Sequence, residues 1–191
     1  MIPEGGGLLT VRPILLLGNP ALYNESSAMR VDDLGDVAPV LKDLRETLLD
    51  FRARHGTGKA IAAPQIGVLK RIVYIHEPGP PRFLLNPVLQ LSGEQIETWE
   101  HCMSFPDLLV RTRRASACSV EYRDEEWRVR VETARGDLAV IIQHECDHLD
   151  GTLAVARALD GRAFCLISQR RHLARHPGVG RTVLRPNSAR W

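Results

Sequence analysis

The sequence predicts an α+β fold in which short, mainly antiparallel strands pack around a central helix that carries an H-E-x-x-H motif. Two observations lead to this fold class. Five short runs of branched and aromatic residues follow one another between residues 71 and 131, with no helical segment between them. Segments with helical apolar spacing lie before and after these runs, so strands and helices do not alternate as they do in a parallel α/β fold.

Three helices and five strands are expected. The first helix has Asp36 as its N-cap and runs to the turn at residues 56–58. The second begins at Asp137 as N-cap and ends at Leu149, with Gly151 just beyond its end. A third helix is expected over residues 161–174. The strands are expected at residues 71–76, 83–91, 108–113, 119–122 and 127–131.

The composition is that of one globular domain. The 191 residues are 44% hydrophobic and 25% charged, which excludes a disordered or collagen-like chain. The longest apolar runs, such as residues 13–17, are too short to cross a bilayer, so we expect no membrane partner. The first residues lack the regions of a secretory signal, which leads us to expect a cytosolic protein.

Charge is distributed unevenly along the chain. Residues 161–191 contain seven arginines and no acidic residue, whereas the net charge of the whole chain is +2. We expect residues 1–160 to form one globular domain and residues 161–191 to form an Arg-rich C-terminal helix and tail that is not an independent domain. The tail could contact the ribosome or another RNA without sequence specificity, or it could be a solvated chain end, as its prolines and glycines favour.

The strongest functional signal is the H-E-x-x-H motif of residues 144–148 in the second predicted helix. Residues four apart lie one turn apart on the same helix face, so His144 and His148 can bind one metal ion. Glu145 lies beside that site, where it can accept a proton from water. Cys146 falls on another face and is expected to pack in the core.

Two imidazoles do not complete a metal site, so a third ligand is required. Cys102 is the candidate, because it lies where a predicted strand ends and a turn begins; the alternative is a buried structural cysteine. His101 is expected not to bind metal, because neighbouring strand positions point to opposite faces.

A third segment, residues 58–67, combines small residues with Gln65, whose amide can donate a hydrogen bond to a ligand. An ordinary turn between a helix and a strand is the alternative interpretation.

Together the three segments resemble the peptide deformylases. They read Gly58-Lys59-Ala60-Ile61-Ala62-Ala63-Pro64-Gln65, then Glu100-His101-Cys102-Met103-Ser104, then Gln143-His144-Glu145-Cys146-Asp147-His148, in the family's order. The resemblance implies a metal-dependent hydrolase that removes the formyl group from the formyl-methionine of nascent polypeptides, with residues 1–160 as its catalytic domain. It also implies a bacterial cytoplasmic location, with an organelle as the alternative setting. It implies one divalent ion, with Fe²⁺ as the native metal and Zn²⁺, Ni²⁺ or Co²⁺ able to replace it.

The resemblance also implies the roles of individual residues. Cys102, His144 and His148 would bind the metal, and Glu145 would be the general base. Gln65 and the backbone N–H of Met103 would stabilise the negative charge that develops on the formyl oxygen.

The substrate-binding residues follow from the same resemblance. Gly58, Lys59 and Ala60 would bind an extended peptide through their backbone. Val140 and Ile141 would form one wall of the methionine site, a role compatible with plain core packing. Ala60 and His101 stand where the family usually has glycine, so Ala60, His101 and Lys59 put substrate preference in question more than the reaction.

Two other functions are compatible with parts of the sequence. A zinc endopeptidase would use the same H-E-x-x-H motif with a downstream third ligand, for which His172 and His176 are available. A catalytically weak relative would instead bind the ribosome or RNA through the basic tail. The presence of Gln65, Cys102 and Glu145 favours the deformylase interpretation over both.

Overall fold

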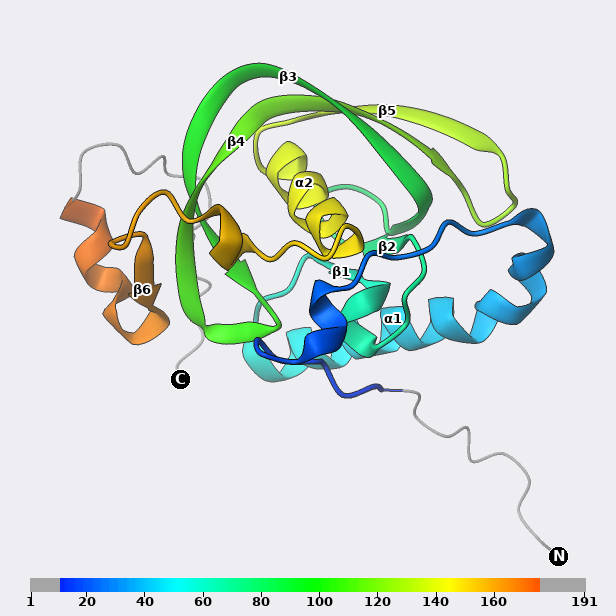
Figure 1. Ribbon diagram of the computed structural model, residues 1–191, viewed down its shortest axis with the longest axis horizontal. Helices are drawn as coiled ribbons and strands as arrows, with labels where there is room; N and C mark the ends of the chain where they lie inside the picture. The colour runs from blue at the N-terminus through cyan, green and yellow to red at the C-terminus, as the bar shows by residue number, and fades with distance from the viewer. Residues whose placement is uncertain (1–10, 176–191) are drawn as a thin grey trace, which may run out of the picture.

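The computed structural model describes residues 11–175 and has the α+β fold that the sequence predicts. Its six strands form one antiparallel sheet in the order β1-β2-β3-β4-β5, with β6 paired to β4 (Figure 1). The strands are β1 (Ala60–Ala62), β2 (Ile72–Ile75), β3 (Arg82–Cys102), β4 (Phe105–Arg123), β5 (Val129–Arg135) and β6 (Phe164–Leu166). The α-helices are α1 (Leu34–His55) and α2 (Asp137–Leu149), and five 3₁₀ helices are η1 (Pro20–Tyr23), η2 (Val31–Asp33), η3 (Ala63–Ile66), η4 (Ala154–Arg157) and η5 (Ile167–Arg175).

The strands β3 and β4 are much longer than expected, with 21 and 19 residues. The prediction of short strands is therefore wrong for this pair, although β1, β2 and β6 are short. Register shifts after Leu85, Ser92 and His101 let the two strands bend without separating. The polar stretch around Gly93 looks like a loop in the sequence, but it belongs to this bent pair, which arches over α2 (Figure 1).

The helix ends agree with the sequence at their C-termini and differ at their N-termini. α1 begins at Leu34, so Asp36 lies in the first turn instead of capping it, and α2 has Gly136 at the N-cap with Asp137 as its first residue. Gly56 ends α1 in the left-handed conformation and donates its N–H to the carbonyl of Arg52 at 2.8 Å. Gly151 follows α2 with a φ of 67°, as predicted.

The third expected helix, over residues 161–174, is not an α-helix. Residues 164–166 form β6, which pairs with residues 108–110 of β4, and a 3₁₀ helix follows. The reason is the open edge of β4, since β5 covers only residues 117–123 on that side. Leu173 of η5 packs against Trp99 and Leu109. The rest of the predicted basic tail, residues 176–191, lies outside the described residues.

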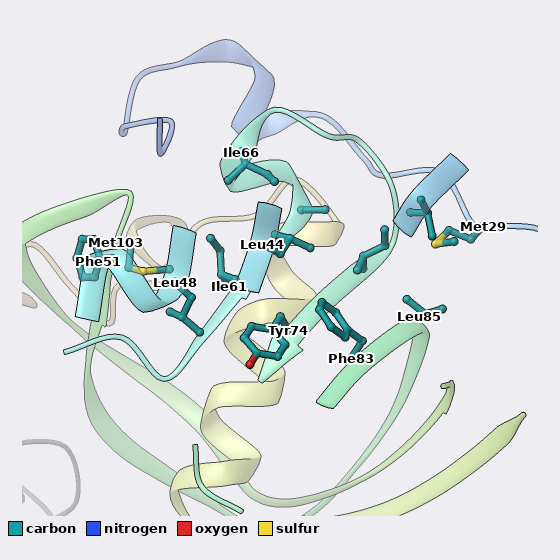
Figure 2. Packing of buried hydrophobic residues seen from close by; sticks show 13 residues of the cluster. Met29, Leu44, Leu48, Phe51, Ile61, Ile66, Tyr74, Phe83, Leu85 and Met103 are labelled. Atoms are coloured by element: carbon teal, nitrogen blue, oxygen red, sulfur yellow. The ribbon is translucent and has the colours of Figure 1, made fainter. Parts of the chain in front are cut away.

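The core lies on both faces of the sheet. On one face, α1 contributes Leu44, Leu48 and Phe51 to a cluster with strand residues such as Ile61 and Phe83 (Figure 2). On the other face, Ala139, Ile142, Cys146 and Leu149 of α2 pack against β1, β2 and β4. α2, which carries the H-E-x-x-H motif, is thus held between β1 and β2 on one side and the arch of β3 and β4 on the other. No helix within residues 11–175 is long and apolar enough to cross a bilayer.

We expect Gly151→Ala to destabilise the fold more than Gly56→Ala does. Both glycines have a positive φ, 67° and 65°, so alanine is strained at each by about 1–2 kcal/mol. At Gly151 the added Cβ would also lie 2.6 Å from the carbonyl oxygen of Tyr23, whereas at Gly56 it would meet nothing within 4 Å. Urea unfolding measures the free energy of unfolding of both variants. Equal losses would contradict the close packing of Gly151 against the Tyr23 carbonyl.

Candidate metal centre and active site

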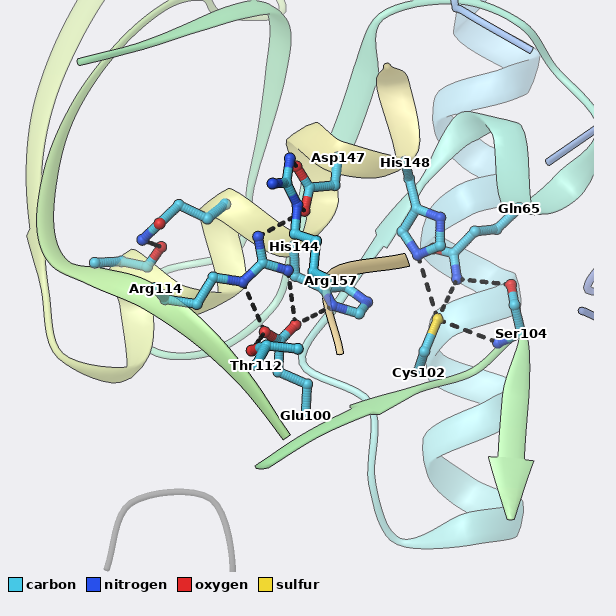
Figure 3. Close-up of polar contacts among 12 residues, drawn as sticks. Gln65, Glu100, Cys102, Ser104, Thr112, Arg114, His144, Asp147, His148 and Arg157 are labelled. Atoms are coloured by element: carbon cyan, nitrogen blue, oxygen red, sulfur yellow. Dashed lines mark hydrogen bonds and ion pairs between the residues drawn. The ribbon is translucent and has the colours of Figure 1, made fainter. Parts of the chain in front are cut away.

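The structure brings the three predicted metal ligands together. One ligand atom from each of Cys102, His144 and His148 lies within 4.8 Å of the other two, and all three residues are buried. The Cys102 Sγ is 3.2 Å from Nε2 of His148 (Figure 3). The helix α2 places the histidines one turn apart, and the end of β3 supplies the cysteine. Among the described residues, His101 and His172 take no part in such a cluster.

His144 is oriented by a carboxylate. Its Nδ1 lies 2.6 Å from Oε2 of Glu100, which leaves Nε2 free to face the cluster. Burial acts to lower the pKa of His144, but the hydrogen bonds and charges of Cys102 and Glu100 raise it well above its usual value. A carboxylate on the far nitrogen is the partner that metal-binding histidines usually have.

Glu100 is itself fixed by a buried ion network. Arg114 donates from Nε to Oε1 at 2.6 Å and from a terminal nitrogen to Oε2 at 3.0 Å, and Thr112 donates its hydroxyl to Oε1 (Figure 3). Burial acts to raise the pKa of Glu100, but His144 and Arg114 together hold it far below its usual value. Glu100 is therefore ionised despite an exposed fraction of 3%.

The network continues to α2. Arg114 donates to Oδ2 of Asp147 at 2.6 Å, and Arg157 of η4 donates to Oδ1 of the same carboxylate at 2.6 Å. No sequence motif indicated a role for Glu100, Thr112, Arg114, Asp147 or Arg157. The one signal for them was the position of Glu100, two residues before Cys102 and hence on the same strand face.

His148 is the second imidazole of the cluster. Burial, followed by the positive charge of His144, lowers its pKa well below its usual value, so its ring is neutral. Its Nδ1 is buried and has no hydrogen-bond partner among the described residues. A thiol and two imidazoles that converge in this way fit a divalent transition metal such as iron or zinc, because three protein ligands leave a position open for substrate.

Glu145 is buried beside the cluster. Burial raises the pKa of its carboxyl to about 7, and its Oε2 has no hydrogen-bond partner among residues 11–175. A carboxyl group with a pKa near neutrality can both accept and return a proton. Cys146, the next residue, packs in the α2 core cluster as expected, and burial raises the pKa of its thiol.

Gln65 contacts the cluster through Cys102. It lies in η3, directly after β1, and its Nε2 is 3.6 Å from Cys102 Sγ and 3.2 Å from Ser104 Oγ. Its Oε1 accepts the N–H of Ala62 at 2.9 Å, which fixes the amide with its NH₂ group toward the cluster. The side chain of Met103 packs in the α1 core cluster. Ser104, whose N–H lies 3.4 Å from Cys102 Sγ, was not predicted.

The predicted peptide-binding residues lie at the edge of the sheet. β1 is an edge strand, so one side of Ala60 has no neighbouring strand within the described residues. The Lys59 carbonyl accepts the N–H of His76 at 2.8 Å, and Arg52 donates to the Gly58 carbonyl at 2.5 Å. Both contacts hold the segment that leads into β1.

Two α2 residues were expected to form a wall beside the site. Val140 is buried and Ile141 is half-buried, and Ile141 packs against the α2 core cluster. His101, which was expected not to bind metal, has its Nε2 2.9 Å from the Pro106 carbonyl oxygen.

Comparison with known proteins decides the family. The sequence model of polypeptide deformylases matches residues 11–163. The chain belongs to the polypeptide deformylase family. It is 34% identical over 170 residues to a peptide deformylase of Leptospira biflexa, covering 82% of this chain and 92% of that one, and 38% identical over 170 residues to peptide deformylase 1 of Prochlorococcus marinus, covering 82% and 85%.

A solved deformylase has the same fold. The crystal structure of a peptide deformylase from Synechococcus elongatus in complex with actinonin superposes with a TM-score of 0.73 at 28% identity, covering 84% of this chain and 86% of that one. As a deformylase, the chain is a metal-dependent hydrolase that removes the N-terminal formyl group of newly made polypeptides. The predicted family and reaction are confirmed.

We expect Arg114→Met to weaken both the fold and metal binding. The change leaves Glu100 and Asp147 buried without their shared cation, which costs about 3–5 kcal/mol of unfolding free energy. It also loosens the orientation of His144, so metal affinity should fall about 10- to 100-fold.

Arg113→Met is the matched control. Arg113 pairs with Glu97 at 3.1 Å on the surface, where a pair contributes only about 0–1 kcal/mol. Urea unfolding and competition for metal with a chelator measure the two effects. Equal behaviour of the two variants would show that the buried network does not support the site.

Proposed function

We propose that Cys102, His144 and His148 bind the metal ion of this deformylase and that Glu145 transfers the proton. The observation that carries the proposal is that the three ligand atoms lie within 4.8 Å of one another. The unpartnered Oε2 of Glu145 is on α2, the helix that carries His144 and His148. When bound there, a divalent metal supplies a Lewis acid that polarises the formyl carbonyl and makes water more acidic.

The remaining steps are performed by side chains and backbone of this chain. Glu145 accepts a proton from water as the water oxygen bonds to the formyl carbon. The Gln65 amide and the backbone N–H of Met103 donate hydrogen bonds to the formyl oxygen, on which negative charge develops. Glu145 then gives the proton to the leaving nitrogen as the C–N bond breaks, and the products are formate and a free amino terminus.

We propose Fe²⁺ as the native ion, as the family resemblance implies. A thiolate and two imidazoles also suit Zn²⁺, Ni²⁺ and Co²⁺, so these ions should be able to replace it. The orientation of His144 by Glu100 supports any of these ions equally, because it concerns the ligand and not the metal.

We propose that the peptide binds along the free edge of β1. In an antiparallel pair, alternate residues turn both backbone groups toward the partner strand. Since Lys59 bonds to β2 through its carbonyl, the N–H and C=O of Ala60 point to the free edge. This supports binding of an extended substrate to residues 58–60, with Val140 and Ile141 beside its first side chain.

The substrates place the protein where formylated chains are made. Deformylases act on formylated nascent peptides, and we propose the bacterial cytoplasm as the location. We further propose that residues 1–160 form the catalytic domain and that residues 161–191 extend it without forming a domain of their own. The pairing of β6 with β4 joins residues 164–166 to the main sheet, which supports the absence of a separate domain there. Ribosome contact through the basic tail stays a prediction.

We expect Glu145→Gln to lower formate release from formyl-Met-Ala-Ser by about 10²- to 10⁴-fold, because the amide cannot accept the proton. Metal content should stay unchanged, since Glu145 is not a ligand. Glu121→Gln on the exposed face of β4 is the control and should release formate at the original rate.

The same assay contains a peptide blocked at both ends, which tests endopeptidase activity. Formate release by Glu145→Gln at the original rate would refute the role of Glu145. Cleavage of the blocked peptide would instead support the peptidase alternative.

We expect Cys102→Ala to abolish the thermal stabilisation that metal provides. A ligand that binds only the folded state raises its unfolding free energy by an amount that grows with concentration over Kd. Addition of Fe²⁺ without oxygen, or of Zn²⁺, should therefore raise the Tm of the original protein after chelator treatment.

Cys165→Ala is the matched control, because Cys165 is a half-buried free thiol outside the cluster. This variant should keep the metal-dependent rise in Tm. A metal-dependent rise that persists in Cys102→Ala would exclude the cysteine as a ligand.

A further inference from the structure

Lys59 forms an ion pair with Asp137, which lies on the face of α2 that carries His144 and His148. Nζ of Lys59 is 3.8 Å from Oδ2 of Asp137, and both side chains are partly exposed, with 44% and 31% of their surface accessible. Lys59 directly precedes β1, and Asp137 is the first residue of α2. The pair therefore bridges the two elements that we propose to enclose the substrate.

The position of the pair follows from helix geometry. Asp137, Ile141 and His144 are spaced by four and three residues, so they share one face of α2. Asp137 lies about 10 Å from His144 along the helix axis, at a rise of 1.5 Å per residue. This face of α2 therefore leads from the metal cluster to the Lys59–Asp137 pair, over a distance that suits a long, unbranched side chain.

The sheet edge gives the same direction. β1 leads from Lys59 to η3, where Gln65 contacts Cys102. The metal cluster therefore lies at one end of this segment and the ion pair at the other. Val140 and Ile141 form the apolar part between them, and the far end is charged.

The pair also leaves one hydrogen-bonding atom unused. Oδ1 of Asp137 is shielded from solvent and has no hydrogen-bond partner within the described part of the chain. A buried acceptor of this kind costs free energy until a donor reaches it. Nζ of Lys59, at 3.8 Å from its partner, has donors to spare for a further acceptor.

We propose that Lys59 and Asp137 determine the first-residue specificity of this deformylase, favouring an unbranched side chain with a hydrogen-bonding group near its end over a hydrocarbon chain of similar length. This inference rests on the proposed function of the site. A terminal amide matches both partners, because its NH₂ group can donate to Asp137 and its oxygen can accept from Lys59. A hydrocarbon chain displaces water from both charges and returns no hydrogen bond, whereas the sulfur of methionine is a weak acceptor for Lys59.

The test compares formyl-Gln-Ala-Ser with formyl-norleucyl-Ala-Ser, whose first side chains have similar length and differ in the polar end. Formate release gives kcat/KM for each peptide, and formyl-Met-Ala-Ser serves as the reference. Calorimetry with the corresponding N-acetyl peptides gives a binding ratio that does not depend on turnover. The proteins are the original chain, Lys59→Met/Asp137→Leu, and Lys70→Met.

Lys70→Met is the matched control, because Lys70 forms a similar exposed pair, 3.3 Å from Asp33, at the start of α1. We expect the glutamine-to-norleucine ratio of kcat/KM to fall by about tenfold or more in the double variant. Norleucine leaves Lys59 and Asp137 without hydrogen-bond partners in the original chain, and this cost disappears when both residues are replaced. The ratio should be unchanged in Lys70→Met, and the binding ratio should move in the same direction.

Two results would overturn the inference in different ways. Formate release with the same ratio in the double variant and in the original chain would show that the pair does not select the first side chain, while the proposed function stands. Absence of formate release from all three peptides by the metal-loaded original chain would refute the proposed function, and the inference with it.

Discussion

The rest of the site depends on the ion pairs that the buried guanidinium of Arg114 forms with Glu100 and Asp147. Arg114 pairs with Glu100 of β3 and Asp147 of α2 at 2.6 Å each, and its side chain has an exposed fraction of 4%. Ions removed from water in this way are stable only when their geometry satisfies every charge. Arg114 meets that condition with its fork of donors, and it thereby fixes the motif helix against the strands that arch over it.

These ion pairs also explain why the Cys102 side chain and the two imidazoles meet. Glu100 and Cys102 are two residues apart on β3 and so face the same way. The carboxylate that Arg114 holds contacts His144 at 2.6 Å, and the cysteine beside it reaches His148 at 3.2 Å. The end of β3 therefore orients one proposed ligand and supplies another, and the register shift between His101 and Cys102 lies at the same strand end.

The sequence indicated the proposed metal ligands, which the structure brings together, but not the residues that orient them. Spacing within a helix is local, so the sequence pointed to His144, Glu145 and His148, and the end of a predicted strand pointed to Cys102. Arg114 lies in a run with Arg111 and Arg113, and nothing local separates the buried arginine from its exposed neighbour. The expected third helix failed for a related reason, because the open edge of β4 that recruits residues 164–166 depends on where β5 ends.

The reactive groups and the proposed specificity pair rely on different physical support. The proposed metal ligands are buried and lie beside the buried ion pair of Arg114 with Glu100, whereas Lys59 and Asp137 are partly exposed and touch neither Glu100 nor Arg114 in the described contacts. Substitutions at residues that share no partners have nearly independent effects on a protein. The first side chain that the site accepts can therefore change through residues 59 and 137 while the geometry that activates the formyl group stays fixed. Ala60, which adds a methyl group at the free edge of β1, belongs with this adjustable part, since its backbone meets the peptide and not the metal.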